Sequence, residues 1–342
     1  MRRFALTLLA VAVVPLLSLG AAGQTRGVAS SAGAAARTPD GQPDLQGYWT
    51  NDTYTPLERP AEAKGKAFFT PEEAAAFLKS RTDRLIGQSR EDVHYDDAIW
   101  QAENYSKQAH MRTSLVTDPP DGKIPPLTAA AHGILAARAE ARRGVGPADS
   151  AQTRTLAERC IAWGNVGPPM VPPTYNANFQ IVQTRDHVLI RHEMMHDVRI
   201  VPLDGRPHPG RRVQMLAGDA RGHWDGDTLV VDTTNFTNHT NFRGSPQSTR
   251  QDIFATDTLH VVERFTRVDA STLRYQFTVE DPSVWTRPWS GEMPLRGFEG
   301  PIYEYACHEG NYGLPNILSA ARVQEAAGRA VDAPTPFNRF AR

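Results

Sequence analysis

VLIRHEMMHDVRIV, residues 188–201, is the stretch that most strongly indicates the fold class. Its side chains divide with period two into an apolar row and a charged row, the pattern of a strand with one buried face. His192 and His196 fall in the apolar row, whereas Glu193 and Arg199 fall in the charged row. The pattern therefore predicts one long strand over these residues.

The same residues contain His192-Glu193-Met194-Met195-His196, which matches the H-E-x-x-H signature of zinc peptidases. A zinc-dependent hydrolase would need a helix here, so that both histidines meet on one face with Glu193 beside the metal-bound water. On a strand Glu193 points away from both histidines, which disfavours that interpretation. Two alternatives stay open for the histidines: satisfied core residues, or a ligand or metal site inside a barrel. The charged row is either a solvated face or the wall of a polar cavity.

Further strands are predicted on both sides of this stretch, separated by turn sequences. Asp225-Gly226 and Asp269-Ala270 supply the turns of two hairpins. The predicted strands are residues 179–184, 228–236, 259–268, 273–280 and 302–306. Consecutive hairpins without intervening helices imply an antiparallel meander. The predicted fold class is mainly β with helical N-terminal segments: an antiparallel β-barrel or curved sheet, somewhat like a lipocalin.

Four parts are predicted along the chain. Arg2 and Arg3 precede an apolar run that ends in small residues, the pattern of a cleavable signal peptide. The predicted parts are a signal peptide (1–23), a flexible leader (24–42), a helical and extended part (43–165), and an antiparallel β-rich part with a C-terminal helix (166–342). Helices are predicted at residues 70–85, 128–143, 150–162 and 316–330, the first with a Thr70–Glu73 capping box.

The charge balance narrows the choice of partners. The chain has 37 Lys and Arg residues against 38 Asp and Glu residues, a formal net charge of −1. Near-neutral charge without a long basic run argues against nucleic acid as a partner. After the signal peptide no stretch approaches the roughly 18 apolar residues of a membrane span. The expected partner is a small molecule or a carbohydrate, and the expected location is the periplasm or the medium.

The two cysteines, Cys160 and Cys307, are far apart in the sequence. In an oxidising compartment the natural interpretation is one disulfide between them. The alternative is a zinc site that uses Cys307 and His308, for which more soft ligands would be needed nearby. No metal and no cofactor is identified from the sequence.

Candidate site residues are polar or aromatic side chains in three neighbourhoods. The stiffened turn at 204–209 carries Arg206 and His208, and the segment 307–312 carries His308 and Glu309. The predicted acid–base residues are Glu193, His196, His208, His308 and Glu309. The predicted substrate-binding residues are Arg199, Arg206, Trp224 and Trp285. We expect one cavity where strand 188–201, the 206–208 turn and the 307–311 segment converge; each residue also has a purely structural interpretation.

At these motifs the chain resembles a family of exported, largely uncharacterised bacterial proteins. The matching sequences are DPPDG at 118–122, LDGRPH at 203–208, GDARGHWDGDTLVV at 218–231, VERF at 262–265 and YEYACHEGN at 303–311. The resemblance implies that Glu193, Arg199 and the Arg206–His208 turn belong to a common pattern. It implies no particular reaction, because none is established for the family.

The leading functional hypothesis is an exported lyase or hydrolase that acts by general acid–base chemistry on a small organic molecule or carbohydrate fragment. Two hypotheses from other classes stay open: a non-catalytic periplasmic ligand-binding protein and a structural envelope protein. Titratable side chains that share one cavity would favour the enzyme, whereas an apolar cavity would favour the binding protein.

Overall fold

The structure is a computed structural model that describes residues 36–86, 111–162, 167–172, 176–238, 254–308, 310–329 and 331. The predicted signal peptide lies outside the described residues. The helices are α1 (Pro71–Ile86), α3 (Ala129–Ala141) and α4 (Gly313–Ala326), with short 3-10 turns η1 (Ala61–Ala63), η2 (Ala151–Thr153) and η3 (Met194–His196). The strands are β1 (Gly47–Thr50), β2 (Val116–Asp118), β3 (Asn178–Gln183), β4 (His187–His192), β5 (Val198–Pro202), β6 (Asp219–Asp225), β7 (Thr228–Thr234), β8 (His260–Arg267), β9 (Thr272–Glu280) and β10 (Trp289–Gly297).

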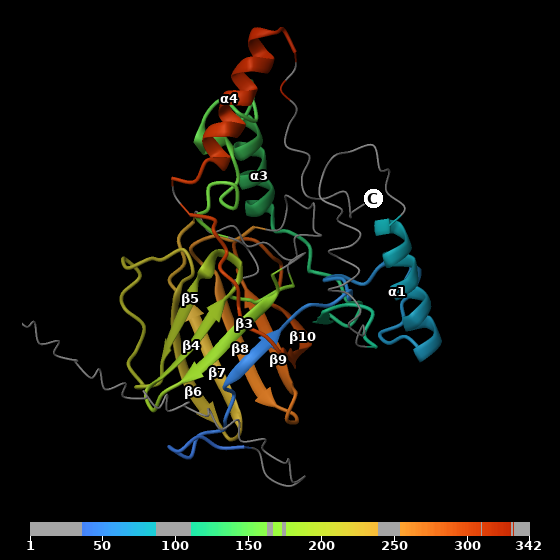
Figure 1. Ribbon diagram of the computed structural model, residues 1–342, viewed down its shortest axis with the longest axis vertical. Coiled ribbons are helices and arrows are strands. Elements are labelled where there is room, and N and C mark those ends of the chain that lie inside the picture. The colour runs from blue at the N-terminus through green and yellow to red at the C-terminus, as the bar shows by residue number, and fades with distance from the viewer. Residues whose placement is uncertain are drawn as a thin grey trace, which may run out of the picture. The chain divides into compact units, whose positions relative to one another are not determined.

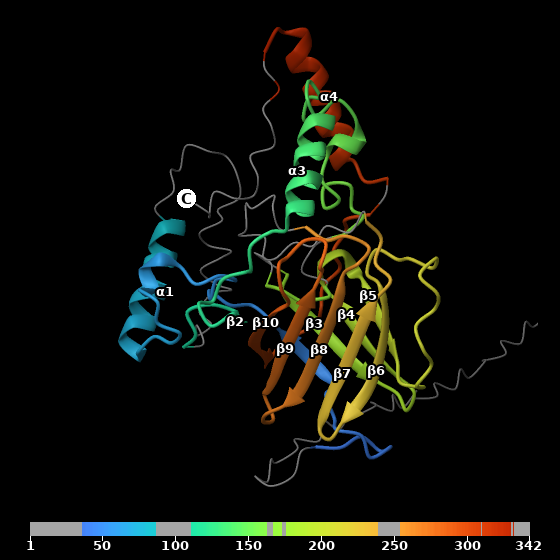
Figure 2. The same ribbon diagram turned by 180° about the vertical axis from the view of Figure 1, so that it is seen from behind.

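The ten strands form one antiparallel sheet that curls into a nearly closed barrel (Figures 1 and 2). The strand order is β5-β4-β3-β1-β10-β9-β8-β7-β6, and β2 pairs with β10 beside this path. The two end strands, β5 and β6, approach each other without pairing in the ladder. The expected fold class, mainly β with an antiparallel barrel, is confirmed. Strands β1 and β2 come from residues 43–165, so this part of the chain belongs to the same sheet.

The direction of the strands explains why the barrel has a seam between β5 and β6. Nine strands lie on the path and every neighbouring pair is antiparallel, so β5 and β6 run in the same direction. A tight hairpin cannot join two such strands, and residues 203–218 must return along the length of the barrel before β6 begins. The seam closes through side chains: a Cβ atom at Gly222 would lie 2.7 Å from both Leu203 Cδ2 and Val201 Cγ1.

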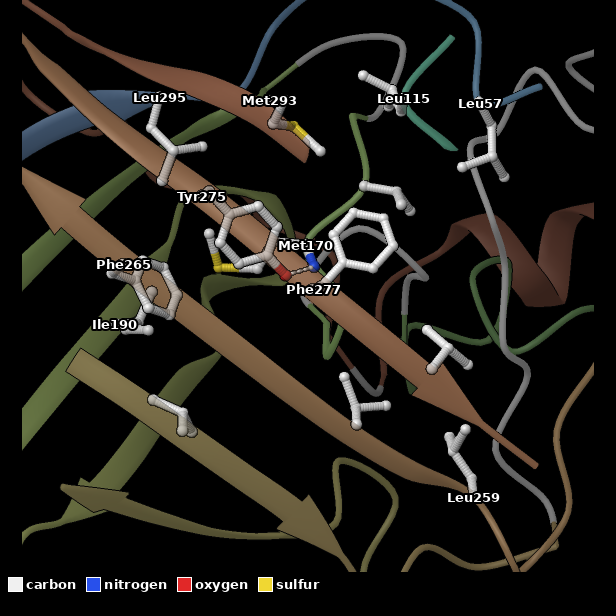
Figure 3. Close-up of a cluster of buried hydrophobic side chains, with 14 of the residues drawn as sticks. Leu57, Leu115, Met170, Ile190, Leu259, Phe265, Tyr275, Phe277, Met293 and Leu295 are labelled. Carbon is white, nitrogen blue, oxygen red and sulfur yellow. Dashed lines mark hydrogen bonds between the residues drawn. The ribbon is translucent and has the colours of Figure 1, made fainter. Parts of the chain in front are cut away.

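The barrel interior is filled by the inward-facing side chains of most strands. Burial alternates along β8, β9 and β10, as the period of a strand requires. Phe265, Tyr275 and Phe277 stack in a row across β8 and β9, with ring centroids 5.0 and 5.6 Å apart. Figure 3 shows this cluster, with Met170 entering it from a segment outside the sheet. The interior is thus a packed core.

Helices α1 and α3 begin within one residue of their predicted starts at 70 and 128, whereas α4 begins at Gly313 instead of residue 316. The Thr70 Oγ1 accepts a hydrogen bond from the Glu73 N–H, and the Glu73 carboxylate accepts one from the Thr70 N–H, which completes the predicted capping box of α1. Thr128 caps α3 through its side chain. Helix α3 packs against the barrel core, and α4 lies beside it in both views. No helix in the described part of the chain is long and apolar enough to cross a membrane.

Three predictions of local structure are wrong. Residues 188–201 do not form one strand: β4 and β5 pair with each other as a hairpin whose turn is η3. Residues 302–306 lie outside any strand, and residues 150–162 form only η2 and irregular turns. Strands β1, β2, β6 and β10 were not predicted from the sequence. Their lengths or their Pro and Gly residues hide the alternation on which a prediction depends.

Candidate functional site

The β4–β5 hairpin turn contains two adjacent non-glycine residues with left-handed backbone. Met195 and His196 both adopt left-handed φ values, 61° and 45°, in a turn that contains no glycine. His192 ends β4 inside the barrel, whereas His196 is the last residue of the η3 turn and is exposed. Since the segment is not helical, the two histidines do not share a helix face as the H-E-x-x-H interpretation requires.

Glu193 lies at the base of this turn and is 3% exposed. Its two carboxylate oxygens accept hydrogen bonds from Asn176 Nδ2 at 2.9 Å and Asn178 Nδ2 at 2.8 Å. Its backbone N–H donates to the carbonyl of Asn178, the first residue of β3. Two amide side chains from one neighbouring segment therefore fix the position of the carboxylate.

His196 is held by the chain's C-terminal part. Its Nδ1 lies 3.0 Å from the backbone carbonyl oxygen of Tyr305. A carbonyl oxygen can only accept, so Nδ1 carries the proton and donates it. In the neutral ring Nε2 is then the unprotonated nitrogen. We call Asn176, Asn178, Glu193, His196 and Tyr305 the tip site.

A disulfide between Cys160 and Cys307 supports the tip site, as predicted, with 5.2 Å between the Cα atoms. Met194 and Met195 pack against Cys160, Tyr305 and Cys307. Six non-glycine residues in the described part of the chain have left-handed φ values, and four of them belong to this neighbourhood: Cys160, Asn176, Met195 and His196. Such backbone is costly, and it concentrates where a structure holds functional groups in place.

The barrel interior contains a buried network of hydrogen bonds among polar side chains. Arg199 on β5 pairs with Glu263 on β8, donating from Nη1 to Oε1 at 3.0 Å and from Nη2 to Oε2. The Tyr275 hydroxyl donates to Glu263 at 2.8 Å and accepts from the Met170 N–H at 2.8 Å (Figure 3). Burial, and then the charge of Glu263, raises the pKa of Tyr275. The guanidinium, the carboxylate and the hydroxyl group all find hydrogen-bond partners within the network, which indicates a structural role for these residues.

His192 is buried without a full set of hydrogen bonds. It is 3% exposed, and its Nε2 finds no hydrogen-bond partner in the described part of the chain. Burial in apolar surroundings, and then the positive charge of Arg199, lowers the pKa of His192 to about 3. The ring therefore stays neutral in the folded protein over the physiological pH range.

His208 belongs to a second polar cluster, on the outer face of β6, β7 and β8. Its Nδ1 lies 2.6 Å from Asp219 Oδ2, and its Nε2 lies 3.1 Å from Asp232 Oδ1. His260 Nε2 lies 3.1 Å from both oxygens of Asp232. The hydrogen bond from His260 lowers the pKa of Asp232, and the same bond raises the pKa of His260. We call His208, Asp219, Asp232 and His260 the His208 cluster.

Four of the remaining predicted site residues lie in the described part of the chain. Arg206 is exposed and pairs with Asp204, and Trp224 is half-buried against the core. Trp285 is buried, with its ring edge against Trp289 at 5.7 Å, so it is not open for stacking on a ligand. His308 is exposed, and its backbone carbonyl accepts from Asn311. Glu309 lies outside the described residues.

Of the three segments that we expected to converge, two are in contact. The β4–β5 turn meets the segment that leads to Cys307, whereas the 206–208 turn packs on the outer face of the barrel. Sequence reasoning missed Asn176 and Asn178, although two asparagines before a predicted strand were visible. It also missed Asp219, Asp232, His260, Glu263 and Tyr275, whose partners come from other strands.

Neither cluster is a ready metal site. Within the described ranges, no group of three or more His, Cys, Asp or Glu side chains is arranged to hold a metal ion. Comparisons of the chain with protein-family models, with curated proteins and with solved structures find no match. Functional inference therefore rests on the geometry of the chain itself.

Proposed function

We propose that the protein is an exported hydrolase or lyase that uses the tip site for general acid–base chemistry on a small polar molecule or carbohydrate fragment. The observation that carries the proposal is the His196 imidazole, with Nδ1–H anchored on the Tyr305 carbonyl. An imidazole fixed in this tautomer presents an unprotonated Nε2, the atom that would accept a proton in general base catalysis.

The neighbouring groups fit this role. Glu193 uses one acceptor site on each oxygen for Asn176 and Asn178, and a carboxylate has about four such sites. The two amides therefore hold the buried carboxylate at the base of the turn that carries His196. His196 would take a proton from water or from the substrate and return it to the leaving group.

The proposed location outside the cytoplasm rests on two independent features. The N-terminal sequence has the charge, apolar run and small residues of a signal peptide. The Cys160–Cys307 disulfide is a bond that persists in oxidising compartments.

The test replaces His196 with asparagine. An asparagine side chain tolerates left-handed backbone and can donate to the Tyr305 carbonyl, but it has no basic nitrogen. We expect His196→Asn to lower turnover by about 100-fold or more, the usual contribution of a general base, without a change in the unfolding midpoint. The assay uses p-nitrophenyl esters and glycosides, and the absorbance of unsaturated products for a lyase.

The matched control is His223→Asn, which changes an exposed histidine on β6 and should retain full turnover. Full activity in His196→Asn would contradict the proposed base. Binding of a saccharide from the panel without turnover by the wild-type protein would instead identify a ligand-binding protein.

A further inference from the structure

The connection between β5 and β6 is a long segment, residues 203–218, that has to return along the outside of the barrel. It is attached to β7 and to the residues that follow it by backbone and side-chain hydrogen bonds. The Met215 N–H donates to the Asn235 carbonyl at 3.0 Å, and the Thr237 N–H donates to the Met215 carbonyl at 3.1 Å. Near the middle of residues 203–218, the Pro209 carbonyl accepts a hydrogen bond from Asn235 Nδ2.

The His208 ring attaches this segment to two strands. Its ring bridges two strands, with Nδ1 at Asp219 on β6 and Nε2 at Asp232 on β7. Asp219 also accepts from Arg221, and Asp232 also meets His260 on β8. His260 Nδ1 in turn lies 3.9 Å from Glu280 on β9. These groups, Asp219, Arg221, Asp232, His260 and Glu280, are the charged or titratable side chains around the bridge.

The number of N–H donors on the His208 ring decides whether it can bind both carboxylates. Ionised carboxylates only accept hydrogen bonds, so both ring nitrogens of His208 have to donate. A neutral imidazole has one N–H, whereas the imidazolium has two. Loss of the ring proton therefore breaks one of the two bonds and leaves a lone pair facing a carboxylate.

We propose that the His208 cluster is a proton-operated latch, which fastens residues 203–218 to β6 and β7 when His208 is protonated and loosens them when it is not. His260 acts in the same sense, because it shares the Asp232 carboxylate. The latch should be strongest in mildly acidic medium, below the raised pKa of His260 and above the lowered pKa of Asp232. It weakens as the pH rises through the raised pKa of His260, because the Asp232 carboxylate then loses a charged partner.

Amide hydrogen exchange of the full-length mature protein tests the latch at about pH 5.5 and about pH 8.5, on either side of the usual histidine range. The measured quantity is the exchange rate of the Met215 amide. The rate is corrected for intrinsic exchange and compared with the rates of amides in β9. The protection of the Met215 amide should fall by about tenfold or more at the higher pH, the effect of losing a hydrogen bond to a charged group. His208→Gln, which can satisfy only one carboxylate with a neutral amide, should show low protection at both pH values.

The control variant His223→Gln changes an exposed histidine on the same strand as Asp219 and should keep the wild-type pH dependence. Asp232→Asn is the second test, should His208→Gln fold poorly: it should abolish most of the pH dependence. Met215 protection that is unchanged by pH in the wild type would overturn the proposal. The proposal would also be overturned if Met215 protection depended on pH in His208→Gln or Asp232→Asn as strongly as in the wild type.

Discussion

His192 is a buried imidazole whose charged form is strongly disfavoured, and this property links the stability of the barrel to pH. Its pKa in the folded protein is about 3, compared with 6.5 as the reference value. Below about pH 6.5 the unfolded chain binds a proton at this ring and the folded chain does not. The stability that depends on the neutral ring is therefore complete above the unfolded pKa and is lost as the pH falls toward the folded pKa.

We predict that His192→Phe removes this dependence while keeping an aromatic ring beside Phe179, whose centroid is 5.7 Å away. Between about pH 6.5 and pH 4 the wild-type protein should lose up to about 1.4 kcal/mol of unfolding free energy per pH unit relative to the variant. Urea unfolding at several pH values measures the difference. Equal slopes in the two proteins would show that His192 is protonated in the folded barrel.

At the scale of elements, the seam between β5 and β6 replaces the hydrogen-bonded ladder with side-chain contact. Gly222 on β6 is the position where this contact is closest, because Val201 and Leu203 occupy the space that a side chain would need. The seam therefore depends on a residue that has no side chain.

We predict that Gly222→Ala lowers the unfolding free energy by about 1–3 kcal/mol, the usual cost of overpacking a core. Gly133→Ala is the matched control: it lies in α3 with nothing within 4 Å of the added carbon. The control should raise the unfolding free energy by about 0.5–1 kcal/mol through helix propensity. Denaturant unfolding of both variants tests the pair, and a neutral Gly222→Ala would mean that the seam opens at little cost.

At the scale of the whole molecule, the disulfide is the covalent link between chain segments 147 residues apart. It joins the end of the helical and extended part to the segment whose Tyr305 carbonyl holds His196. In the chain-entropy account, a loop of this length restricts the unfolded state strongly.

We predict that the Cys160→Ser/Cys307→Ser variant loses about 4 kcal/mol of unfolding free energy. The wild-type protein with a reducing agent should lose the same amount, since both treatments remove one bond. Urea unfolding with and without reductant compares them. A reductant effect that persists in the double variant would place the change outside this disulfide.

The sequence by itself determined the features that depend on neighbours in the chain. The Thr70–Glu73 capping box and the Asp225-Gly226 turn are local hydrogen-bonding patterns, and alternation identified β3, β7, β8 and β9. Two cysteines allow only one intramolecular pairing, so that prediction needed no structure. Only the tertiary structure decided that residues 188–201 turn back at Met195, because a turn built from Met and His carries none of the Gly, Asn or Asp signals of left-handed backbone. That turn resets the alternation, so Arg199 faces the interior and meets Glu263, 64 residues away. His208 likewise finds Asp219 and Asp232 through strand order, which no spacing in the sequence encodes.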